Sequence, residues 1–515
     1  MLFAALLLGG AAAPAPERVD LIIRGGTVYT GTDAPFVGDV AVSGDRIRAV
    51  GRRLSQRAAK VIDARGMIVA PGFIDPHAHI GPQLASDDSQ ARLIPGFLMQ
   101  GVTTAFIGND GGGDVDAAAV LGSAARKPVG INFAVFVGFG AVRSAVIGEA
   151  DRAPTSGELQ RMKALVAKAM CQGALGLSTG LFYAPQSFAA RGEVVALARE
   201  AGTRGGVYDS HIRDESSYTI GLAAAVDEAL AIGREARLPV NISHIKALGV
   251  DVHGQAPAII AKIEAARAAG QRVTADQYPW SASGTSLVAA LVPRWAQDGG
   301  RATMLRRFDD PALANRLRTD INDNLRRRGG TTTLLITEGE QKGWRLSEIF
   351  FRLGTADPVA GTIELIRQGD RAVASFNQTE EDIAAFMARP WVMTGSDAST
   401  GHPRAYGSFA RKYSEYVRGR RVLSLRQFIE RSTVLVADTF GLKDRGRLRP
   451  GAFADLVVFD PNRFAARATY EQPTLLATGV RTVLVNGVPA VENGRLTGEA
   501  SGRALAKAPP EGACV

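Results

Sequence analysis

Short runs in which branched apolar residues alternate with polar ones mark both ends of the chain. Alternation with a period of two, interrupted by turn residues, is typical of β-strands. The runs lie at residues 20–29, 38–47, 61–63, 454–460 and 483–488. We therefore predict a small β-sandwich assembled from both termini, over residues 17–71 and 438–500, with residues 501–515 as a tail.

Between these ends, over residues 72–437, short apolar runs alternate with longer runs rich in alanine and leucine. Residues 103–108 and 240–244 are typical of strands, and residues 193–200 are typical of a helix. Alternation of strand and helix implies a parallel sheet, and this length favours a closed, TIM-like (β/α)₈ barrel. A more polar stretch over residues 288–345 predicts an insertion that could act as a lid.

The composition is that of a globular protein and changes this picture little. The chain has 515 residues, 46% of them hydrophobic and 22% charged, with a formal net charge of +9. The basic residues are scattered, and their densest cluster is the triplet Arg326-Arg327-Arg328. Because basic stripes and aromatic platforms are both missing, we interpret the charge as a solvated basic surface and expect no nucleic-acid partner.

The first residues bear on the compartment. Residues 1–16 (MLFAALLLGGAAAPAP) resemble a secretory signal peptide with a short, uncharged beginning. This predicts a periplasmic or secreted protein, and a plain tail on a cytoplasmic protein is the alternative. The apolar run is too short to span a bilayer, and no later segment qualifies. The two cysteines, Cys171 and Cys514, lie far apart in sequence, and we predict neither a disulfide framework nor a CxxC metal site.

The positions of the histidines are the most informative chemical signal. His77 and His79 stand two apart after an apolar strand, so both imidazoles share one face of the chain. His211, His244 and Asp397 each follow another predicted strand, at the end where barrels place their chemistry. A single histidine at a strand end is more often a satisfied polar residue. The joint pattern, however, indicates a metal centre.

Neutral imidazoles and a carboxylate suit Zn²⁺, with one coordination position left for water. A bound zinc ion lowers the pKa of that water from nearly 16 to about 7. Asp397 could then accept its proton and pass it to a leaving nitrogen, as a general acid and base. The other histidines, His253 and His402, lie in loop-like sequence, and we interpret neither as a ligand.

Several motifs resemble a known family. Residues 71–79 (PGFIDPHAH) resemble the opening metal motif of the amidohydrolase superfamily, and more narrowly the chain is similar to the D-aminoacylase, or N-acyl-D-amino-acid deacylase, family. The other matching segments are residues 101–104, 173–185, 211–215 (HIRDE), 242–246, 395–397, 402–407 and 444–448. The resemblance implies a barrel with a β-sandwich from both termini, and hydrolysis of N-acyl-D-amino acids.

The resemblance also implies roles for individual residues. It places His77, His79, His211 and His244 on the metal and gives proton transfer to Asp397. It further implies that Lys246, Tyr278 and Arg404 hold the free carboxylate of a small-molecule substrate. The guanidinium fork of Arg404 suits that role, since it binds carboxylates with two hydrogen bonds.

The chain departs from the family pattern at one metal position. The family usually has a metal-bridging cysteine in a Gly-Asn-Cys-Gly turn, whereas residues 108–111 read Gly-Asn-Asp-Gly. We therefore place Asp110 among the metal ligands. A carboxylate is a harder ligand than a thiolate, so the centre could hold one or two zinc ions, or admit Mn²⁺ or Co²⁺. The loop between Asp397 and His402 is also shorter than the family's usual loop.

Three other functions remain open. A dipeptidase for peptides ending in a D-residue needs the same carboxylate anchors, and a hydrolase of cyclic or lipophilic amides does not. A catalytically dead binding protein would keep the scaffold, but Asp397 and the candidate histidines are all present. The acyl group, the preferred side chain, the number of metal ions and the oligomeric state are not determined by the sequence.

Overall fold

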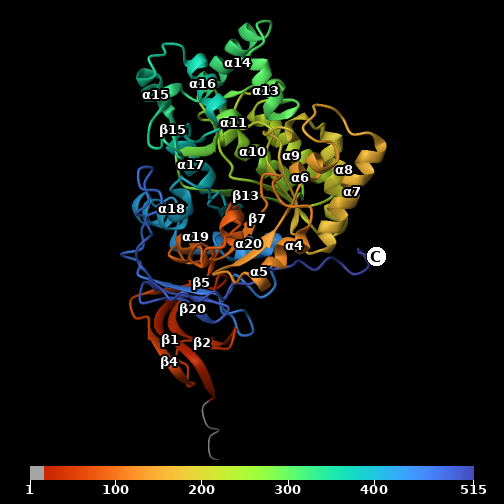
Figure 1. Ribbon diagram of the computed structural model, residues 1–515. Helices are drawn as coiled ribbons and strands as arrows, with labels where there is room; N and C mark the ends of the chain where they lie inside the picture. Colours follow the sequence, from red (N-terminus) through yellow and green to blue (C-terminus); the bar gives the residue numbers. More distant parts are fainter. Residues whose placement is uncertain (1–16, 515) are drawn as a thin grey trace, which may run out of the picture.

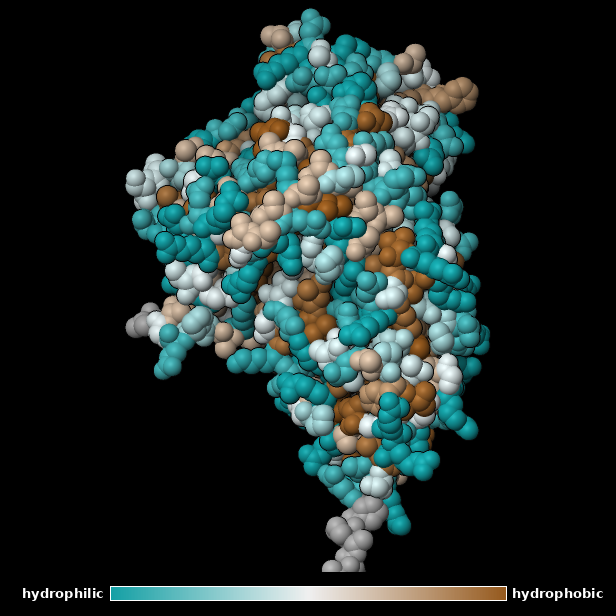
Figure 2. Space-filling model, turned by 180° about the vertical axis from the view of Figure 1, so that it is seen from behind, coloured by the Kyte–Doolittle hydropathy of each residue, from teal (hydrophilic) through white to brown (hydrophobic). Residues whose placement is uncertain are grey.

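The structure is a computed structural model that describes residues 17–514 of the chain. The predicted signal peptide over residues 1–16 lies outside the described residues. No helix of the described part is long and apolar enough to cross a membrane. Seen from behind in Figure 2, hydrophilic residues cover most of the surface, and apolar residues form scattered patches between them.

Strands from the two ends of the chain pair with one another at the bottom of Figure 1. They form a nine-stranded sheet in the order β21-β20-β19-β18-β5-β1-β2-β3, with β4 also paired to β1. The two ends meet where β18 pairs antiparallel with β5, so that Leu456 faces Pro71 and Phe459 faces Ile68. The strands are β1 (Arg18–Val28), β2 (Phe36–Ser43), β3 (Arg46–Gly51), β4 (Arg57–Asp63), β5 (Ile68–Pro71), β18 (Leu456–Phe459), β19 (Val480–Val485), β20 (Val488–Glu492) and β21 (Arg495–Leu496).

The middle of the chain carries parallel strands joined by helices. One sheet has the order β6-β7-β8 and another the order β17-β13-β12-β11-β10-β9, and every pairing in them is parallel. The strands are β6 (Phe73–Asp75), β7 (Val102–Ile107), β8 (Asn132–Val135), β9 (Val137–Gly138), β10 (Gly176–Gly180), β11 (Val207–His211), β12 (Val240–Ile242), β13 (Val273–Gln277) and β17 (Val392–Thr394). The predicted α/β architecture with parallel sheets is confirmed.

Helices cover the parallel strands, which are therefore buried on both faces. In α7 (Ser156–Cys171), Thr155 and Glu158 form a capping box, while Met162, Val166 and Met170 face the core at intervals of four residues. The other helices of this region are α1 (Gly81–Ala85), α2 (Ser89–Arg92), α3 (Pro95–Leu98), α4 (Ala117–Leu121), α5 (Ser123–Arg126), α6 (Phe139–Val146), η1 (Gln186–Phe188), α8 (Arg191–Thr203), α9 (Leu222–Ala236), α10 (Ala256–Ala268), α17 (Glu380–Met387), α18 (Arg404–Arg411), η3 (Lys412–Gly419), α19 (Leu425–Arg431) and α20 (Val434–Phe440).

An insertion follows β13 and lies at the top of Figure 1. It begins and ends with β14 and β16, which pair antiparallel from Ala282 opposite Phe376 to Ser286 opposite Ala372. It has an apolar core of its own, which includes Leu291, Ile321 and Leu365. Its elements are β14 (Ala282–Ser286), α11 (Leu287–Leu291), α12 (Arg294–Gln297), α13 (Gly300–Phe308), α14 (Ala314–Arg327), η2 (Thr331–Thr333), β15 (Leu334–Ile336), α15 (Leu346–Arg352), α16 (Pro358–Gln368) and β16 (Ala372–Phe376).

The insertion is therefore longer than the predicted stretch over residues 288–345. That prediction rested on polarity, and polarity marks only the exposed helices α13 and α14. The helices that follow return to an apolar pattern because Ile349, Phe350 and Leu365 pack into the core of the insertion. Their sequence thus resembles that of a helix packed against the parallel strands.

The C-terminal segment returns to the parallel strands instead of ending as a free tail. The amide of Leu505 donates to the carbonyl of Phe133 at 2.7 Å, and the amide of Lys507 donates to that of Gly173 at 2.9 Å. A disulfide then joins Cys514 to Cys171 at the end of α7, with their Cα atoms 5.7 Å apart. This bond corrects the expectation from the sequence, where a separation of 343 residues hides the contact.

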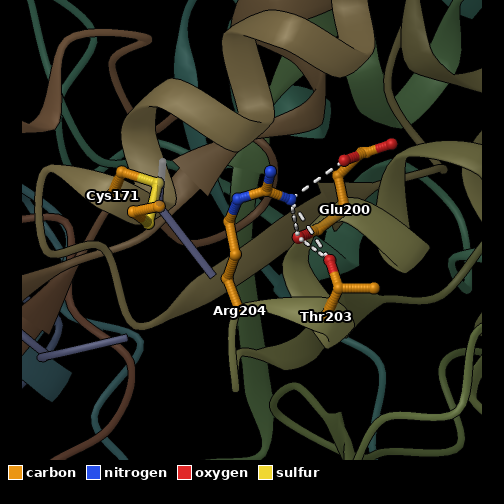
Figure 3. Close-up of a disulfide and its surroundings, with 5 residues drawn as sticks. Cys171, Glu200, Thr203 and Arg204 are labelled. Carbon is orange, nitrogen blue, oxygen red and sulfur yellow. Dashed lines mark hydrogen bonds and ion pairs between the residues drawn. A yellow bond between two sulfur atoms is a disulfide. The ribbon is translucent and has the colours of Figure 1, made fainter. Parts of the chain in front are cut away.

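The disulfide lies beside the last turn of α8, as Figure 3 shows. There Arg204 Nη1 donates to the Glu200 carbonyl at 3.0 Å and to Glu200 Oε2 at 2.9 Å. A cation at a helix C-terminus satisfies a free carbonyl and complements the helix dipole. The disulfide thus attaches the C-terminal segment to the end of α7, next to the end of α8.

Candidate metal centre

The candidate ligands gather where the parallel strands end. His77 and His79 follow β6, Asp110 follows β7, and His244 and Asp397 follow β12 and β17. His211 is the last residue of β11. The carboxyl ends of parallel strands lie at the same edge of a sheet, which is why residues so far apart in sequence meet here.

Three of these residues have an unusual backbone conformation. Asp110, His244 and Asp397 have φ angles of 56°, 35° and 50°. Residues other than glycine rarely adopt positive φ, and such positions concentrate at functional sites. The turn at each position places its side chain among the other candidate metal ligands.

His77, His79, Asp110 and Asp397 form one group of potential ligands. Their donor atoms all lie within 4.8 Å of one another. His79 Nε2 lies 3.2 Å from Asp397 Oδ1 and 3.3 Å from Asp110 Oδ2. His77 Nε2 lies 3.4 Å from Asp110 Oδ1 and 3.6 Å from Asp397 Oδ1. Two imidazoles and carboxylate oxygens at this spacing suit tetrahedral zinc.

Asp110 also belongs to a second group, with His211 and His244. Its Oδ2 lies 3.6 Å from His211 Nδ1, and its Oδ1 lies 3.5 Å from His244 Nε2. The Asp110 carboxylate therefore stands between two pairs of histidines, in the position of a bridging ligand.

Buried atoms without partners support the assignment of a metal. Both ring nitrogens of His77 and of His211, and Oδ1 of Asp110, are buried and make no hydrogen bond within the described chain. Buried polar groups are nearly always satisfied, so these atoms require a ligand that the protein itself does not supply. A divalent cation in each ligand group would satisfy Asp110 Oδ1 and one ring nitrogen of each histidine.

Electrostatics keeps the bridging carboxylate ionised. Burial acts to raise the pKa of Asp110, but the imidazoles of His77, His244 and His211 outweigh it and hold that pKa well below its usual range. A ligand carboxylate must be deprotonated to bind metal, so Asp110 is prepared for this role.

A buried polar network that the sequence pattern does not reveal contacts the ligands of the centre. Asp276 Oδ1 accepts from the backbone amide of His244 at 2.9 Å and lies 3.8 Å from His77 Nδ1. Asn241 Nδ2 donates to Asp276 Oδ2 and to Asp209 Oδ1, both at 2.8 Å. Such partners fix the orientation of ligating histidines. Asp276 is the residue that precedes Gln277 at the end of β13, so its position at a strand end was available as a signal.

A cavity of about 500 Å³ opens beside these ligands. It is lined by His79, Asp110, His211, His244 and Asp397 from the strand ends, and also by residues of the insertion. The volume lies in the range of pockets that bind small molecules.

The three predicted carboxylate-binding residues all line this cavity. The ring of Tyr278 lies between the two cations, with its centroid 5.2 Å from Arg404 Cζ and 5.6 Å from Lys246 Nζ. Arg404 Nη1 donates to Asp397 Oδ2 at 2.6 Å, and the Arg404 amide donates to His402 Nδ1 at 3.2 Å. His402 therefore positions Arg404 and stays outside both ligand groups, as does His253.

Lys246 makes contacts that the sequence did not predict. Its Nζ lies 2.6 Å from Glu215 Oε1 and 2.7 Å from His244 Nδ1. Glu215 belongs to the HIRDE motif, but the sequence analysis gave it no role. In the structure it joins Lys246 to the second ligand group. Tyr183 was also missed, although it lines the cavity with its ring centroid 4.8 Å from that of His211.

The sequence that forms this site matches a known protein family. A model of the amidohydrolase family matches residues 60–491. The chain belongs to the amidohydrolase family. It is 33% identical to the D-aminoacylase of Alcaligenes xylosoxydans xylosoxydans, an alignment that covers 95% of this chain and 98% of that protein.

Two solved structures extend the comparison. A D-aminoacylase with a binuclear metal centre is 33% identical and superposes with a TM-score of 0.81, covering 95% of this chain and all of that one. An N-acyl-D-glutamate deacylase from Bordetella bronchiseptica, in complex with zinc and a phosphonate that mimics the tetrahedral intermediate, is 32% identical with a TM-score of 0.80 over the same shares. The recognised resemblance to D-aminoacylases is confirmed.

Proposed function

We propose that this amidohydrolase cleaves the amide bond of N-acyl-D-amino acids and releases a carboxylic acid and a free D-amino acid. One observation carries the proposal. A single cavity is lined both by the metal ligands His79, Asp110 and His244 and by the cations Lys246 and Arg404. A substrate with an acyl carbonyl and a free carboxylate a few bonds apart fits both sets of groups. The relatives are named for the same kind of reaction, as a D-aminoacylase and an N-acyl-D-glutamate deacylase.

Zinc, when bound by the histidines and Asp110, supplies a Lewis acid that polarises the acyl carbonyl and makes water a competent nucleophile near neutral pH. Asp397 is placed to move the proton. Its Oδ1 lies 3.2 Å from His79 Nε2, beside the metal ligands, and its Oδ2 accepts from Arg404. As a carboxylate it accepts a proton from the attacking water, and it returns the proton to the leaving nitrogen.

Arg404 links substrate binding to this proton transfer. Burial acts to raise the pKa of Asp397, but Arg404 and the neighbouring histidines hold it well below its usual range. When the substrate carboxylate binds the Arg404 guanidinium, it neutralises part of the positive charge that lowers the pKa of Asp397. The basicity of Asp397 then rises when substrate is in place.

Replacing Arg404 by alanine is expected to lower kcat/KM for N-acetyl-D-leucine by about 100-fold, mainly through a higher KM. Loss of a buried charge-assisted pair removes binding that ground state and transition state share. Arg404→Lys should recover part of the loss, because it keeps the charge without the planar fork. Steady-state kinetics on the three enzymes measures this.

The control for Arg404 is Arg426→Ala, which removes an exposed arginine that pairs with Glu430 at 2.6 Å on the surface. That variant should behave like the unmodified enzyme. An unchanged KM in Arg404→Ala would instead favour a hydrolase of cyclic or lipophilic amides, which carry no free carboxylate. A dipeptidase is distinguished by comparing N-acetyl-D-leucine with a dipeptide that ends in D-leucine.

The finer architecture is also part of the proposal. We infer that the parallel strands close into the predicted (β/α)₈ barrel. In support, only Phe136 separates β8 from β9, and the ends of β6 and β17 are joined by a parallel bridge between Ala78 and Ala398. The amide of Asp397 donates to the His77 carbonyl at 2.8 Å across the same junction.

We likewise keep the β-sandwich as a proposal for the sheet formed by both termini. In support, Ile23 and Val42 of the N-terminal strands pack in one apolar cluster with Val458 and Leu484 of the C-terminal strands. Residues from distant strands of one sheet share a core when the sheet folds over on itself.

We also propose that the protein is exported to the periplasm or secreted. The Cys171–Cys514 disulfide supports this, because such bonds persist in oxidising compartments and are rare in the cytosol. The predicted signal peptide is a second, independent reason.

Breaking the disulfide is expected to lower the free energy of unfolding by about 2–4 kcal/mol, since the bond restricts the unfolded chain. Denaturant unfolding of the enzyme with and without reductant, and of Cys514→Ser, measures the change. Before reduction, a thiol reagent should label neither cysteine. Labelling of both cysteines in the unreduced enzyme would contradict the disulfide, and recovery of the enzyme only from the cytoplasm would contradict export.

A further inference from the structure

Arg328 is buried at the wall of the catalytic cavity, although the sequence placed it in a solvated basic triplet. It follows the last residue of α14, its exposed fraction is 2%, and its side chain lines the cavity. Arg326, two residues earlier, is exposed and pairs with Asp251 at 2.6 Å on the surface. Of the three arginines, Arg328 is therefore the one that is buried and not part of the predicted basic surface.

The guanidinium of Arg328 has no anionic partner among residues 17–514. Its Nε donates to Tyr218 Oη at 2.6 Å, and its Nη1 is buried and makes no hydrogen bond within the described chain. No carboxylate of residues 17–514 forms an ion pair with it within 4.0 Å. Glu338 and Asp370 line the same cavity but lie beyond that distance.

Some other buried arginines are paired with carboxylates, whereas buried Arg431 donates to the backbone carbonyl of Met387. Arg143 forms an ion pair with Glu193, and Arg404 pairs with Asp397. Withdrawing a guanidinium from water without a counter-ion is costly, and proteins nearly always compensate it. Arg328 is therefore a buried cation that lacks the partner its chemistry requires.

Arg294 adds a second cation beside the same wall. Its Cζ stacks 3.9 Å from the ring centroid of Phe182, which lines the cavity. Its Nη2 donates to the Ala289 carbonyl at 3.0 Å, and its Nη1 is buried and makes no hydrogen bond within the described residues. Withdrawal from water lowers the pKa of Arg294 to about 10, which still leaves it charged at neutral pH.

We propose that this wall binds a second carboxylate of the substrate, in addition to the one held by Arg404 and Lys246, and that Arg328, assisted by Arg294, is its receptor. This inference rests on the proposed function and specifies its substrates as N-acyl-D-amino acids with two carboxylates. The second carboxylate belongs either to an acidic D-side chain or to a dicarboxylic acyl group. In both cases it supplies the counter-ion that residues 17–514 do not give Arg328.

The test compares substrates that differ only in that carboxylate, using the full-length zinc-loaded enzyme. N-acetyl-D-glutamate is compared with N-acetyl-D-glutamine, which has the same shape but no side-chain charge. N-succinyl-D-leucine is compared with N-butanoyl-D-leucine, which lacks the terminal carboxylate of the acyl chain. We expect kcat/KM to favour the charged member of one pair by about 100-fold, and the pair that shows it identifies the source.

Arg328→Met should reduce that ratio to near one, because it keeps much of the side-chain volume and removes the charge. Arg326→Met, on the neighbouring exposed position, is the matched control and should keep the full ratio. Zinc content and the thermal unfolding midpoint establish that both variants are folded and loaded. Arg294→Met should reduce the ratio by a smaller factor.

The outcomes separate this inference from the proposed function. Hydrolysis of N-acetyl-D-leucine without any preference for a second carboxylate would overturn the inference and leave the function intact. A preference that survives in Arg328→Met would also overturn it, since the receptor would then lie elsewhere. Failure to hydrolyse every N-acyl-D-amino acid in the panel would overturn both.

Discussion

Replacing Asp397 by asparagine is expected to lower kcat by about 10³-fold while leaving the KM for N-acetyl-D-leucine within a few-fold. Asparagine keeps the shape of the side chain and an oxygen near His79 Nε2, which Asp397 Oδ1 approaches at 3.2 Å. It cannot accept the proton of the attacking water or return it to the leaving nitrogen. The loss therefore falls on the chemical step, and steady-state kinetics separates it from binding.

Zinc content decides how that result is interpreted, because Asp397 also lies within one group of potential metal ligands. Metal analysis of Asp397→Asn should give the same zinc content as the unmodified enzyme. A variant that keeps its zinc and still turns over at the original rate would remove Asp397 from the mechanism.

Replacing Asp110 by alanine is expected to lower both zinc content and kcat/KM, the latter by more than about 100-fold. Asp110 contributes to both ligand groups, so its loss weakens each of them. Even residues that only support a ligand are typically worth about 10–100-fold. Asp110→Cys should retain zinc and most activity, since a thiolate is a softer and competent zinc ligand.

The matched control for this pair is Asp114→Ala, which removes an exposed carboxylate from the same loop. That variant should resemble the unmodified enzyme in zinc content and turnover. If Asp110→Ala binds as much zinc as the unmodified enzyme and keeps its activity, the carboxylate is not a bridging ligand. The number of ions that the unmodified enzyme holds follows from the same metal analysis.

Simple geometry explains why so much of the centre was predictable. Strand ends are visible in sequence as apolar runs, and the carboxyl ends of parallel strands converge. His77, His211, His244 and Asp397 could therefore be placed together from their positions alone. Asp110 and Arg404 needed the family pattern, because a turn aspartate and a helical arginine have many other roles.

What could not be predicted depends on contacts between distant segments. Burial of Arg328 depends on how the insertion packs against the loop that carries Tyr218, and no local pattern encodes this. The role of Glu215 depends on its contact with Lys246 and His244, which follow the neighbouring strand β12. Arginine and glutamate are usually exposed, so their sequence positions do not indicate that the fold buries Arg328 and Glu215.

The measurement that tests the account most directly is turnover of the two enantiomers of N-acetyl-leucine, with zinc bound and after chelation. We expect hydrolysis of the D-enantiomer at least about 100-fold faster than that of the L-enantiomer, because only the D-configuration places the acyl carbonyl at the metal and the carboxylate at Arg404 together. We also expect that chelation abolishes this turnover and that added zinc restores it. Undiminished turnover after verified removal of the metal, or no turnover of the D-enantiomer by the zinc-loaded enzyme, would contradict the account.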